Sequence, residues 1–303
     1  MGSISNPGSR ERQTLGGHSL LVRYANFVRL PHTVFALPFA LIGAVTASWT
    51  TPLGWRTVLL VVAAFTAARF VAMGFNRIAD RAFDARNPRT ASRELPQGRM
   101  SVGEAWAAVA VAALVFEGAA WALNPLCFAL SPVALAAVVG YSYTKRFTWS
   151  SHLWLGLADA ISGPAGYLAV TGHWSTPWWT LPVLAAAVTA WVGGFDIFYA
   201  LQDEDFDRRE GLHSAVVRFG AGPAIFLAKT LHGVAILALV AFGLAAGFHT
   251  PFLIGVGIGA ALIAWEHQLV RPGDLSKLNA AFFTMNGVIS ITVFLGAVVD
   301  RVI

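Results

Sequence analysis

Long apolar segments separated by short polar stretches make up most of this chain. Nine segments of roughly 18–25 residues stand out, near 31–49, 57–76, 102–122, 126–143, 153–171, 178–199, 222–246, 251–270 and 278–299. A helix needs about 20 predominantly apolar residues to cross the hydrocarbon core of a bilayer. The pattern therefore predicts an all-α fold, a multi-pass transmembrane bundle of about nine helices with a central cavity.

The composition supports a membrane protein over a soluble one. Hydrophobic residues make up 56% of the 303 positions and charged residues only 12%, whereas soluble domains carry about 25% charged residues. A soluble protein with a very large core is excluded, because span-length apolar segments recur along nearly the whole chain. The single cysteine, Cys127, rules out an intramolecular disulfide.

The distribution of basic residues predicts the orientation in the membrane. With the N-terminus inside, 18 of the 21 Lys and Arg residues are cytoplasmic, two lie outside and Arg69 falls within a segment. The polar tail at 1–22 has no apolar core like that of a cleaved signal peptide, so we expect the first segment to direct insertion. The net charge of +5 resides in short loops, so no nucleic acid partner is expected. We expect an integral protein of a bacterial inner membrane.

Two similar acidic motifs occur at the ends of the second and sixth segments, both on the predicted cytoplasmic side. On one continuous helix, residues at i, i+4 and i+8 would lie along one face. The second motif follows the first by 123 residues at each position, which suggests one domain at 23–303 with equivalent halves near 23–146 and 147–303. The first motif is Asn76, Asp80 and Asp84, and the second is Tyr199, Asp203 and Asp207.

Acidic helix ends that face each other would repel unless cations neutralise them. Carboxylate and amide oxygens are suitable ligands for Mg²⁺, which takes its remaining ligands from substrate phosphates. Nearby basic groups could hold phosphate oxygens without metal; they are Arg77, Arg81, Lys145, Arg146 and Arg209, with His213 as a neutral donor. The remaining arginines of this region, Arg86, Arg89, Arg93 and Arg99, are interpreted as a topology signal.

Arg69 is a full charge within an apolar segment, seven residues before Asn76. An unpaired guanidinium in a membrane is costly, which makes the residue a functional candidate. Two interpretations stay open. Arg69 could recognise the carboxylate of a substrate, or it could pair with Glu117 of the third segment.

The motif N-x-x-x-D-x-x-x-D at 76–84, the stretch from Asp196 to Asp207 and the stretch from Tyr143 to Thr148 resemble the UbiA superfamily of intramembrane prenyltransferases. The resemblance covers essentially the whole chain. Within the superfamily the chain resembles the 4-hydroxybenzoate polyprenyltransferase group, in which an arginine matches Arg69. The segments 89–98 and 209–214 resemble its 4-hydroxybenzoate-like branch, some members of which are similar to prenyltransferases for 1,4-dihydroxy-6-naphthoate. His213 is a departure, since the ubiquinone enzymes tend to carry Lys there.

The resemblance implies a role for each matched residue. Two Mg²⁺ ions and a prenyl diphosphate would be bound by Asn76, Asp80, Asp84, Asp203 and Asp207, and Lys145 with Arg146 would contact the diphosphate. Tyr143, Asp196 and Tyr199 would shape the aromatic site and assist deprotonation. Independently of the resemblance, positions 196, 199, 203 and 207 share one helix face.

Together with the acidic motifs, the resemblance implies a Mg²⁺-dependent enzyme that transfers a polyprenyl group from an allylic diphosphate to a small hydroxylated aromatic acid, whose carboxylate Arg69 could recognise, as in respiratory quinone biosynthesis. Its partners would be these two substrates and membrane lipid. The acceptor would be 4-hydroxybenzoate or, alternatively, 1,4-dihydroxy-6-naphthoate. An ion-coupled transporter is the alternative from another class; it is disfavoured because the acids cluster at segment ends rather than near the middle of the membrane.

Overall fold

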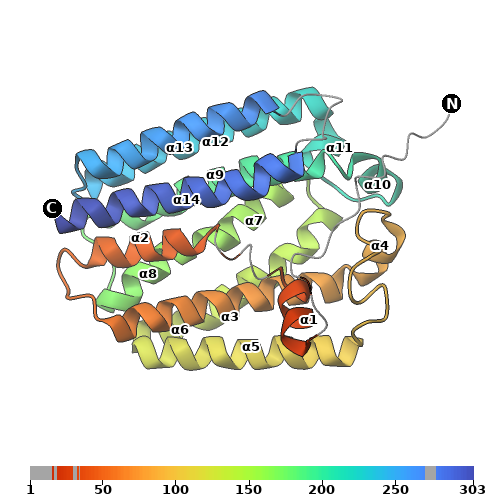
Figure 1. The fold of residues 1–303 in the computed structure, drawn as a ribbon, viewed down its shortest axis with the longest axis horizontal. Helices are drawn as coiled ribbons and strands as arrows, with labels where there is room; N and C mark the ends of the chain where they lie inside the picture. Colours follow the sequence, from red (N-terminus) through yellow and green to blue (C-terminus); the bar gives the residue numbers. More distant parts are fainter. Residues whose placement is uncertain (1–15, 17–18, 30–32, 34, 270–277) are drawn as a thin grey trace.

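The computed structural model describes residues 16, 19–29, 33, 35–269 and 278–303, with 21 and 278–284 described by their backbone only. Within these ranges every regular element is helical (Figure 1). The elements are α1 (Leu20–Phe27), α2 (Leu37–Ala47), α3 (Trp55–Ala79), α4 (Arg81–Arg86), α5 (Val102–Leu123), α6 (Pro125–Gly140), the 3-10 helix η2 (Tyr141–Arg146), α7 (Ser151–Ala160), α8 (Ser162–Thr171), α9 (Thr180–Ala200), α10 (Glu204–Arg209), α11 (Ala215–Phe219), α12 (Ala221–Ala245), α13 (Thr250–Leu269) and α14 (Leu278–Val302).

The long helices agree with the predicted segments. Eight helical stretches of the described chain are long and apolar enough to cross a membrane, with α7 and α8 together forming one of them. The remaining predicted segment, the first one at 31–49, corresponds to α2, an apolar helix of eleven residues. The prediction of an all-α bundle of about nine helices is confirmed.

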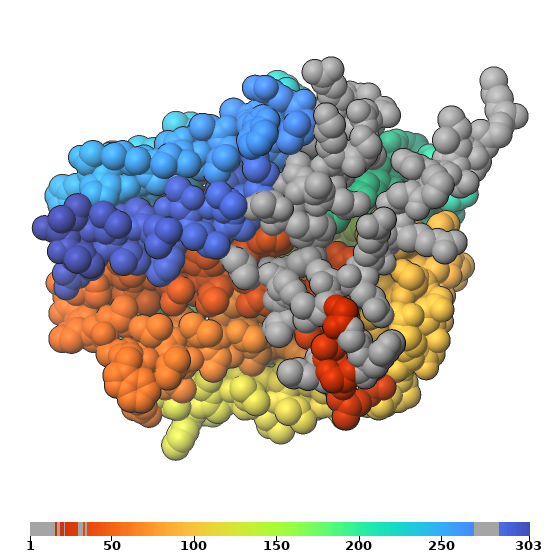
Figure 2. All heavy atoms as spheres, in the orientation of Figure 1, coloured from red at the N-terminus to blue at the C-terminus, as the bar shows by residue number. Residues whose placement is uncertain are grey.

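The long helices form a closed ring in which α9 is the most deeply buried member. α9 packs between α7 and α12, while α12, α13 and α14 lead round to α2. α14 lies directly against α2, as the space-filling view shows where blue meets orange (Figure 2). On the other side, α3 packs against α5 and α6. α4, α10 and α11 lie together at one end of the ring, and the C-terminus lies at the opposite end (Figure 1).

Large apolar side chains cover the outside of the ring. Trp55, Leu114, Trp121, Phe226 and Leu237 are all more than 70% exposed. A soluble protein rarely exposes extended apolar surface of this kind, whereas a lipid-facing helix does. Together with the long apolar helices, this surface identifies an integral membrane protein.

Two stretches near the N-terminus differ from the predictions. The expected polar tail at 1–22 falls mostly outside the described residues, but α1 already begins at Leu20, where the Ser19 side chain caps it by accepting a hydrogen bond from the Val22 amide. The first predicted segment, 31–49, is helical only from Leu37 within the described chain. Pro38 at the first turn of α2 suits a helix start, because a residue there needs no amide hydrogen bond.

The third departure is at the acidic motifs, where the chain does not continue as one helix. α3 ends at Ala79, and Asp80 adopts φ −97° and ψ 6° before α4 begins at Arg81. α9 likewise ends at Ala200, ahead of a turn and α10. The single helix face predicted for each motif was therefore wrong. Each motif instead spans a turn, which lets its last carboxylate project from a separate short helix.

Close approach of α2 and α8 closes the ring beside the central cavity. An added Cβ on Gly166 of α8 would overlap the backbone oxygen of Ala40 in α2, and one on Gly43 would overlap the backbone oxygen of Gly163. Backbone atoms cannot yield as a flexible side chain would, so only glycine allows this spacing.

We therefore expect Gly166→Ala to lower the free energy of unfolding by about 1–3 kcal/mol, the cost of overpacking a tight contact. The measurement is the thermal unfolding midpoint of the purified protein in detergent. The matched control is Gly118→Ala on the exposed face of α5, where an added Cβ meets nothing within 4 Å. Equal effects of the two substitutions would contradict the close-packing argument.

Candidate active site

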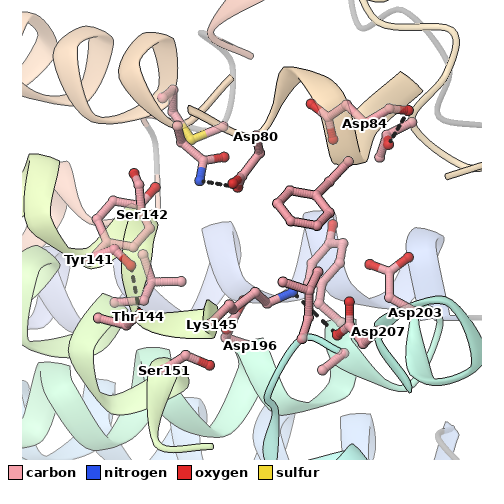
Figure 3. Close-up of a pocket in the computed structure, with 18 of the residues that line it drawn as sticks. Asp80, Asp84, Tyr141, Ser142, Thr144, Lys145, Ser151, Asp196, Asp203 and Asp207 are labelled. Atoms are coloured by element: carbon pink, nitrogen blue, oxygen red, sulfur yellow. Dashed lines mark hydrogen bonds and ion pairs between the residues drawn. The ribbon is translucent and has the colours of Figure 1, made fainter. Parts of the chain in front are cut away.

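A cavity of about 270 Å³ lies between the motif-bearing ends of α3 and α9, with η2 and α7 completing its wall. Figure 3 shows Asp80 and Asp84 on one side, Asp203 and Asp207 on the other, and Lys145 between them. The structure thus brings both acidic motifs to one cavity. Of the predicted site residues, those that line it are Arg69, Asn76, Asp80, Asp84, Lys145, Arg146, Asp196, Tyr199, Asp203 and Asp207.

The two acidic turns have nearly the same local geometry. Asp203 has φ −106° and ψ 5°, close to the values of Asp80, and each of these residues precedes a helix of six residues. The amide of Asp84 donates to the carbonyl of Asp80 over 2.8 Å, and the amide of Asp207 donates to that of Asp203 over 2.7 Å. The 123-residue repeat therefore extends to the backbone of the site.

Two arginines from the segment after α4 hold one carboxylate of each motif. Arg93 Nη1 donates to both oxygens of Asp84, at 2.7 and 2.9 Å. Arg89 contacts Asp203 through two nitrogens, Nε at 2.9 Å and Nη2 at 2.5 Å, and Asn87 Nδ2 donates to the same carboxylate over 3.0 Å. The two-nitrogen contact of Arg89 is bidentate, a geometry that is among the strongest charge-assisted hydrogen bonds. This segment therefore ties the first motif to the second.

The other two carboxylates meet basic residues of η2. Arg146 Nη2 lies 3.0 Å from Asp80 and also donates to the carbonyl of Ala79. Lys145 Nζ lies 3.5 Å from Asp207. These positions follow from the tight 3-10 turn that continues α6, because its last residues point toward the cavity. All four motif carboxylates thus have a basic partner within the chain.

The pKa values of these acids differ because the partners differ. Burial raises the pKa of Asp80 above its ordinary value despite the Arg146 contact, and the Asp84 charge raises it further. Burial likewise raises the pKa of Asp207 despite Lys145. Burial acts in the same sense on Asp203, but the Arg89 ion pair and hydrogen bond outweigh it and lower the pKa. The basic partner therefore outweighs burial at Asp203 but not at Asp80 or Asp207.

Asp196 lies deeper in the cavity, where the chain fixes it through a histidine. His152 is buried, and its Nδ1 lies 2.7 Å from Asp196. Because the amide of Ala215 donates to His152 Nε2 over 3.2 Å, the imidazole proton is on Nδ1 and is donated to Asp196. Nearby, the amide of His213 donates to the carbonyl of Lys145 over 2.7 Å. The 213–215 backbone therefore braces both an acid and a base of the cavity.

Arg69 is paired with a different acid from the one considered in the sequence. Its Nη1 lies 3.5 Å from Asp159 of α7, and both side chains are mostly buried. Pairing with Glu117 was wrong, because that carboxylate accepts a hydrogen bond from Ser131 over 2.5 Å. Carboxylate recognition by Arg69 stays a prediction.

Four predicted substrate-binding residues do not line the cavity, and neither does Arg81, whose Nη1 donates to the carbonyl of Ile78 over 3.0 Å. Arg77 is buried, Arg209 and His213 are exposed, and Tyr143 is about 40% exposed. The Tyr143 ring lies beneath the Arg146 guanidinium, 4.7 Å from ring centroid to Cζ, so it contacts a cavity residue. Roles for these four residues stay predictions.

Sequence reasoning missed several residues that the structure places at the cavity. Arg89 and Arg93 were assigned to topology, although four arginines in the 15 residues that follow Asp84 exceed what a topology signal needs. Asp159 is an acid within an apolar segment, and the argument applied to Arg69 should have identified it too. Further lining residues that were not predicted are Arg29, Asn87, Thr90, Tyr141, Ser142 and Ser151.

The donor set suits a hard divalent cation. The motif side chains supply only oxygen donors, the ligand type that Mg²⁺ takes from proteins. Asp207 Oδ2 is buried and accepts no hydrogen bond, and burial raises the pKa of both Asp80 and Asp207 despite their basic partners. No described group of three His, Cys, Asp or Glu residues converges as a ready metal cage, since basic side chains stand between the acids. The residues therefore fit a cation that a second ligand helps to hold.

The amino-acid sequence matches the UbiA prenyltransferase family over residues 36–288, and the chain belongs to that family. A curated relative, the 4-hydroxybenzoate octaprenyltransferase of Alkalilimnicola ehrlichii, is 33% identical over 74% of this chain and 75% of its own length. The enzyme of the same name from Nitrosococcus oceani is 29% identical over 88% of this chain and 93% of its own length. The resemblance identified from the motifs is thus confirmed.

Solved structures agree with this assignment. A UbiA homologue from Aeropyrum pernix K1 has a TM-score of 0.80 and 31% sequence identity, covering 90% of this chain and 98% of its own. A UbiA homologue from Archaeoglobus fulgidus, bound to DMAPP and Mg²⁺, has a TM-score of 0.69. At 18% identity, covering 93% of this chain and 99% of its own, this second homologue shares the fold.

The buried Arg89–Asp203 pair should matter far more than the exposed Arg86–Glu210 pair. We expect Arg89→Gln to cost about 3–5 kcal/mol of stability at pH 7, because it leaves a buried charge unpaired. Arg86→Gln, the control, should cost about 0–1 kcal/mol. The measurement is thermal unfolding in detergent without divalent metal.

The pH dependence gives a second test of the same pair. In the native protein Asp203 has a pKa below its ordinary value of 3.8. It therefore stabilises the fold at every pH above 3.8, and this stabilisation is lost as the pH falls through the pKa of the folded state. Without Arg89, burial raises the pKa of Asp203, so the carboxylate of the variant becomes protonated, and its buried charge is removed, at a higher pH. The stability gap between the two proteins should therefore narrow from pH 7 toward pH 4; a constant gap would contradict the assignment.

Proposed function

We propose that this protein transfers a polyprenyl group from an allylic diphosphate to a hydroxylated aromatic acid of the 4-hydroxybenzoate type, in respiratory quinone biosynthesis. The single observation that carries the proposal is the convergence of two acidic turns and four basic side chains on one cavity. The family and the curated relatives named 4-hydroxybenzoate octaprenyltransferase support it.

The diphosphate would bind at the acidic turns together with two Mg²⁺ ions. Bound Mg²⁺ would neutralise negative charge on the diphosphate and so stabilise it as a leaving group. The chain's own part is to supply ligands and donors. The ligands would be Asn76, Asp80, Asp84, Asp203 and Asp207, and on binding Arg89, Arg93, Lys145 and Arg146 become available to phosphate oxygens.

The acceptor would lie deeper, between Arg69 and Asp196. Arg69 would hold the carboxylate, and Asp196 and Tyr199 would face the ring. The carbon–oxygen bond to the diphosphate breaks, with its electron pair leaving on pyrophosphate, and a ring carbon ortho to the phenol forms the new carbon–carbon bond. The ring proton passes to Asp196, which is suited to accept it because His152 already holds one of its oxygens in place.

The apolar tail of the prenyl donor would need a separate binding region without water. A second cavity of about 360 Å³, lined almost entirely by apolar residues of α2, α3, α5, α6, α7 and α8, adjoins the first. A long isoprenoid placed there is buried without displacing polar groups. Exclusion of water from this region would also protect the allylic fragment from hydrolysis.

We further propose an inner-membrane location with the acidic turns facing the cytoplasm, since 18 basic residues fall on that side of the chain. The chain would consist of two equivalent halves, near 23–146 and 147–303. The matching turns at Asp80 and Asp203 support this division. 1,4-Dihydroxy-6-naphthoate is the second candidate acceptor, because Arg69 can pair with any aromatic carboxylate.

Asp203→Asn and Asp205→Asn test the donor end as a matched pair. Asp203 lines the cavity, while Asp205 is exposed two residues further on. We expect Asp203→Asn to lower Mg²⁺-dependent pyrophosphate release more than about 100-fold, beyond the range for residues that only support a ligand. Asp205→Asn should keep near-native activity. The assay uses washed membranes and a polyprenyl diphosphate; full turnover in Asp203→Asn would refute this metal site.

A competition assay that offers 4-hydroxybenzoate and 1,4-dihydroxy-6-naphthoate together identifies the acceptor. We expect Arg69→Leu to raise the KM for the preferred acid about tenfold or more, because a charge-assisted contact worth about 1.5–3 kcal/mol is lost. The KM for the prenyl diphosphate should stay unchanged. An unchanged acceptor KM would remove Arg69 from the acceptor site.

A further inference from the structure

The polar and apolar cavities share one stretch of wall. Among the described residues, the side chains that line both cavities are Arg69 and Asp159. Arg69 comes from α3 and Asp159 from the last turn of α7, on opposite sides of the boundary. An ion pair therefore stands where the proposed acceptor and donor tail would meet.

This pair is looser than the other buried ion pairs of the site. Its single contact joins Arg69 Nη1 to Asp159 Oδ1 at 3.5 Å, whereas Arg89 and Arg93 each make two contacts between 2.5 and 2.9 Å. Among the described residues, Asp159 is the hydrogen-bond partner of the Arg69 side chain. The buried Nε of Arg69 donates no hydrogen bond to a described residue. One long contact is exchanged more readily for another anion than a bidentate pair is.

The pair also lies apart from the other cations of the cavity. Arg69 precedes Asp80 by eleven residues on α3, about 16 Å along the helix axis. Arg89, Arg93, Lys145 and Arg146 all contact the acidic turns at the far end. Asp196, which His152 holds, lines the same cavity as Asp159.

The proposed function requires the acceptor carboxylate and the diphosphate to bind at different ends of one cavity. A bare Arg69 would attract the multiply charged diphosphate as well as the acceptor carboxylate, because in a low dielectric a full charge acts over many ångströms. With Asp159 beside it, the charge of Arg69 is balanced, and Asp196 adds a further negative charge at the deep end. The single carboxylate of an acceptor can replace Asp159 as the partner of Arg69 without changing the net charge. A diphosphate, in contrast, is bound more favourably at the metal-binding end.

We propose that Asp159 is a specificity-determining residue: as an internal counter-ion of Arg69 it reserves the deep end of the cavity for a monocarboxylate and keeps diphosphate out. The inference rests on the proposed function, because it assumes that an aromatic acid and a diphosphate bind together. The Arg69–Asp159 ion pair, rather than Arg69 alone, would then select the class of acceptor.

The first experiment uses the native enzyme in detergent with saturating Mg²⁺. Inorganic pyrophosphate should inhibit transfer competitively with the prenyl diphosphate and not with 4-hydroxybenzoate, while benzoate should compete with 4-hydroxybenzoate alone. Native enzyme that transfers no prenyl group refutes the proposed function. Transfer in which pyrophosphate also competes with the acceptor refutes only the role of Asp159.

The second experiment repeats these measurements with Asp159→Asn. Pyrophosphate should now compete with the acceptor too, and the KM for the anionic acceptor, the hydroxybenzoate, should fall about tenfold because a like charge has been removed. The KM for its neutral amide analogue, the hydroxybenzamide, should not change. Glu117→Gln is the control, since it removes a carboxylate that faces Ser131 outside the polar cavity, and it should leave all patterns as in the native enzyme.

A folded Asp159→Asn enzyme with the native inhibition pattern would overturn the proposal. So would a general rise in the KM for both acceptors, which indicates a structural role. If Asp159→Asn does not fold, Asp159→Glu keeps the charge on a longer side chain and should retain the native pattern. Competition of pyrophosphate with the acceptor in that variant would equally overturn the assignment.

Discussion

The whole site depends on the neutralisation of carboxylates that are buried at the ends of membrane helices. Four acids from two turns face one cavity, and each meets an arginine or lysine of the chain. Ionised carboxylates cannot be withdrawn from water without a counter-charge. The segment 87–99 and the turn η2 therefore serve the same purpose from opposite sides of the cavity, and the positions of both follow from this electrostatic requirement.

The prediction of the helices from sequence succeeded because a bilayer imposes length and composition on each of them. The two acidic motifs were equally visible, since charge is rare in such segments. What could not be predicted was the backbone at Asp80 and Asp203, where the chain turns rather than continuing as a helix. Periodicity carries no information on a break that tertiary contacts determine.

The ion-pair partners were the other limit of sequence reasoning. Arg69 was assigned to Glu117 as one alternative, but its neighbour is Asp159, 90 positions away in the chain. Arg89 was assigned to topology, although it bridges 114 positions to Asp203. Such pairings depend on how helices are arranged around the ring, and a single sequence does not specify that arrangement. Spacing along the chain identified the acids but not their partners.

The backbone bridge at residues 213–215 has a mechanical consequence. One amide there is fastened to the carbonyl of Lys145 and another to the imidazole that holds Asp196. Because α10 is followed by this bridge after a few residues, the Asp203–Asp207 turn, Lys145 and Asp196 are all joined through the backbone of one short segment.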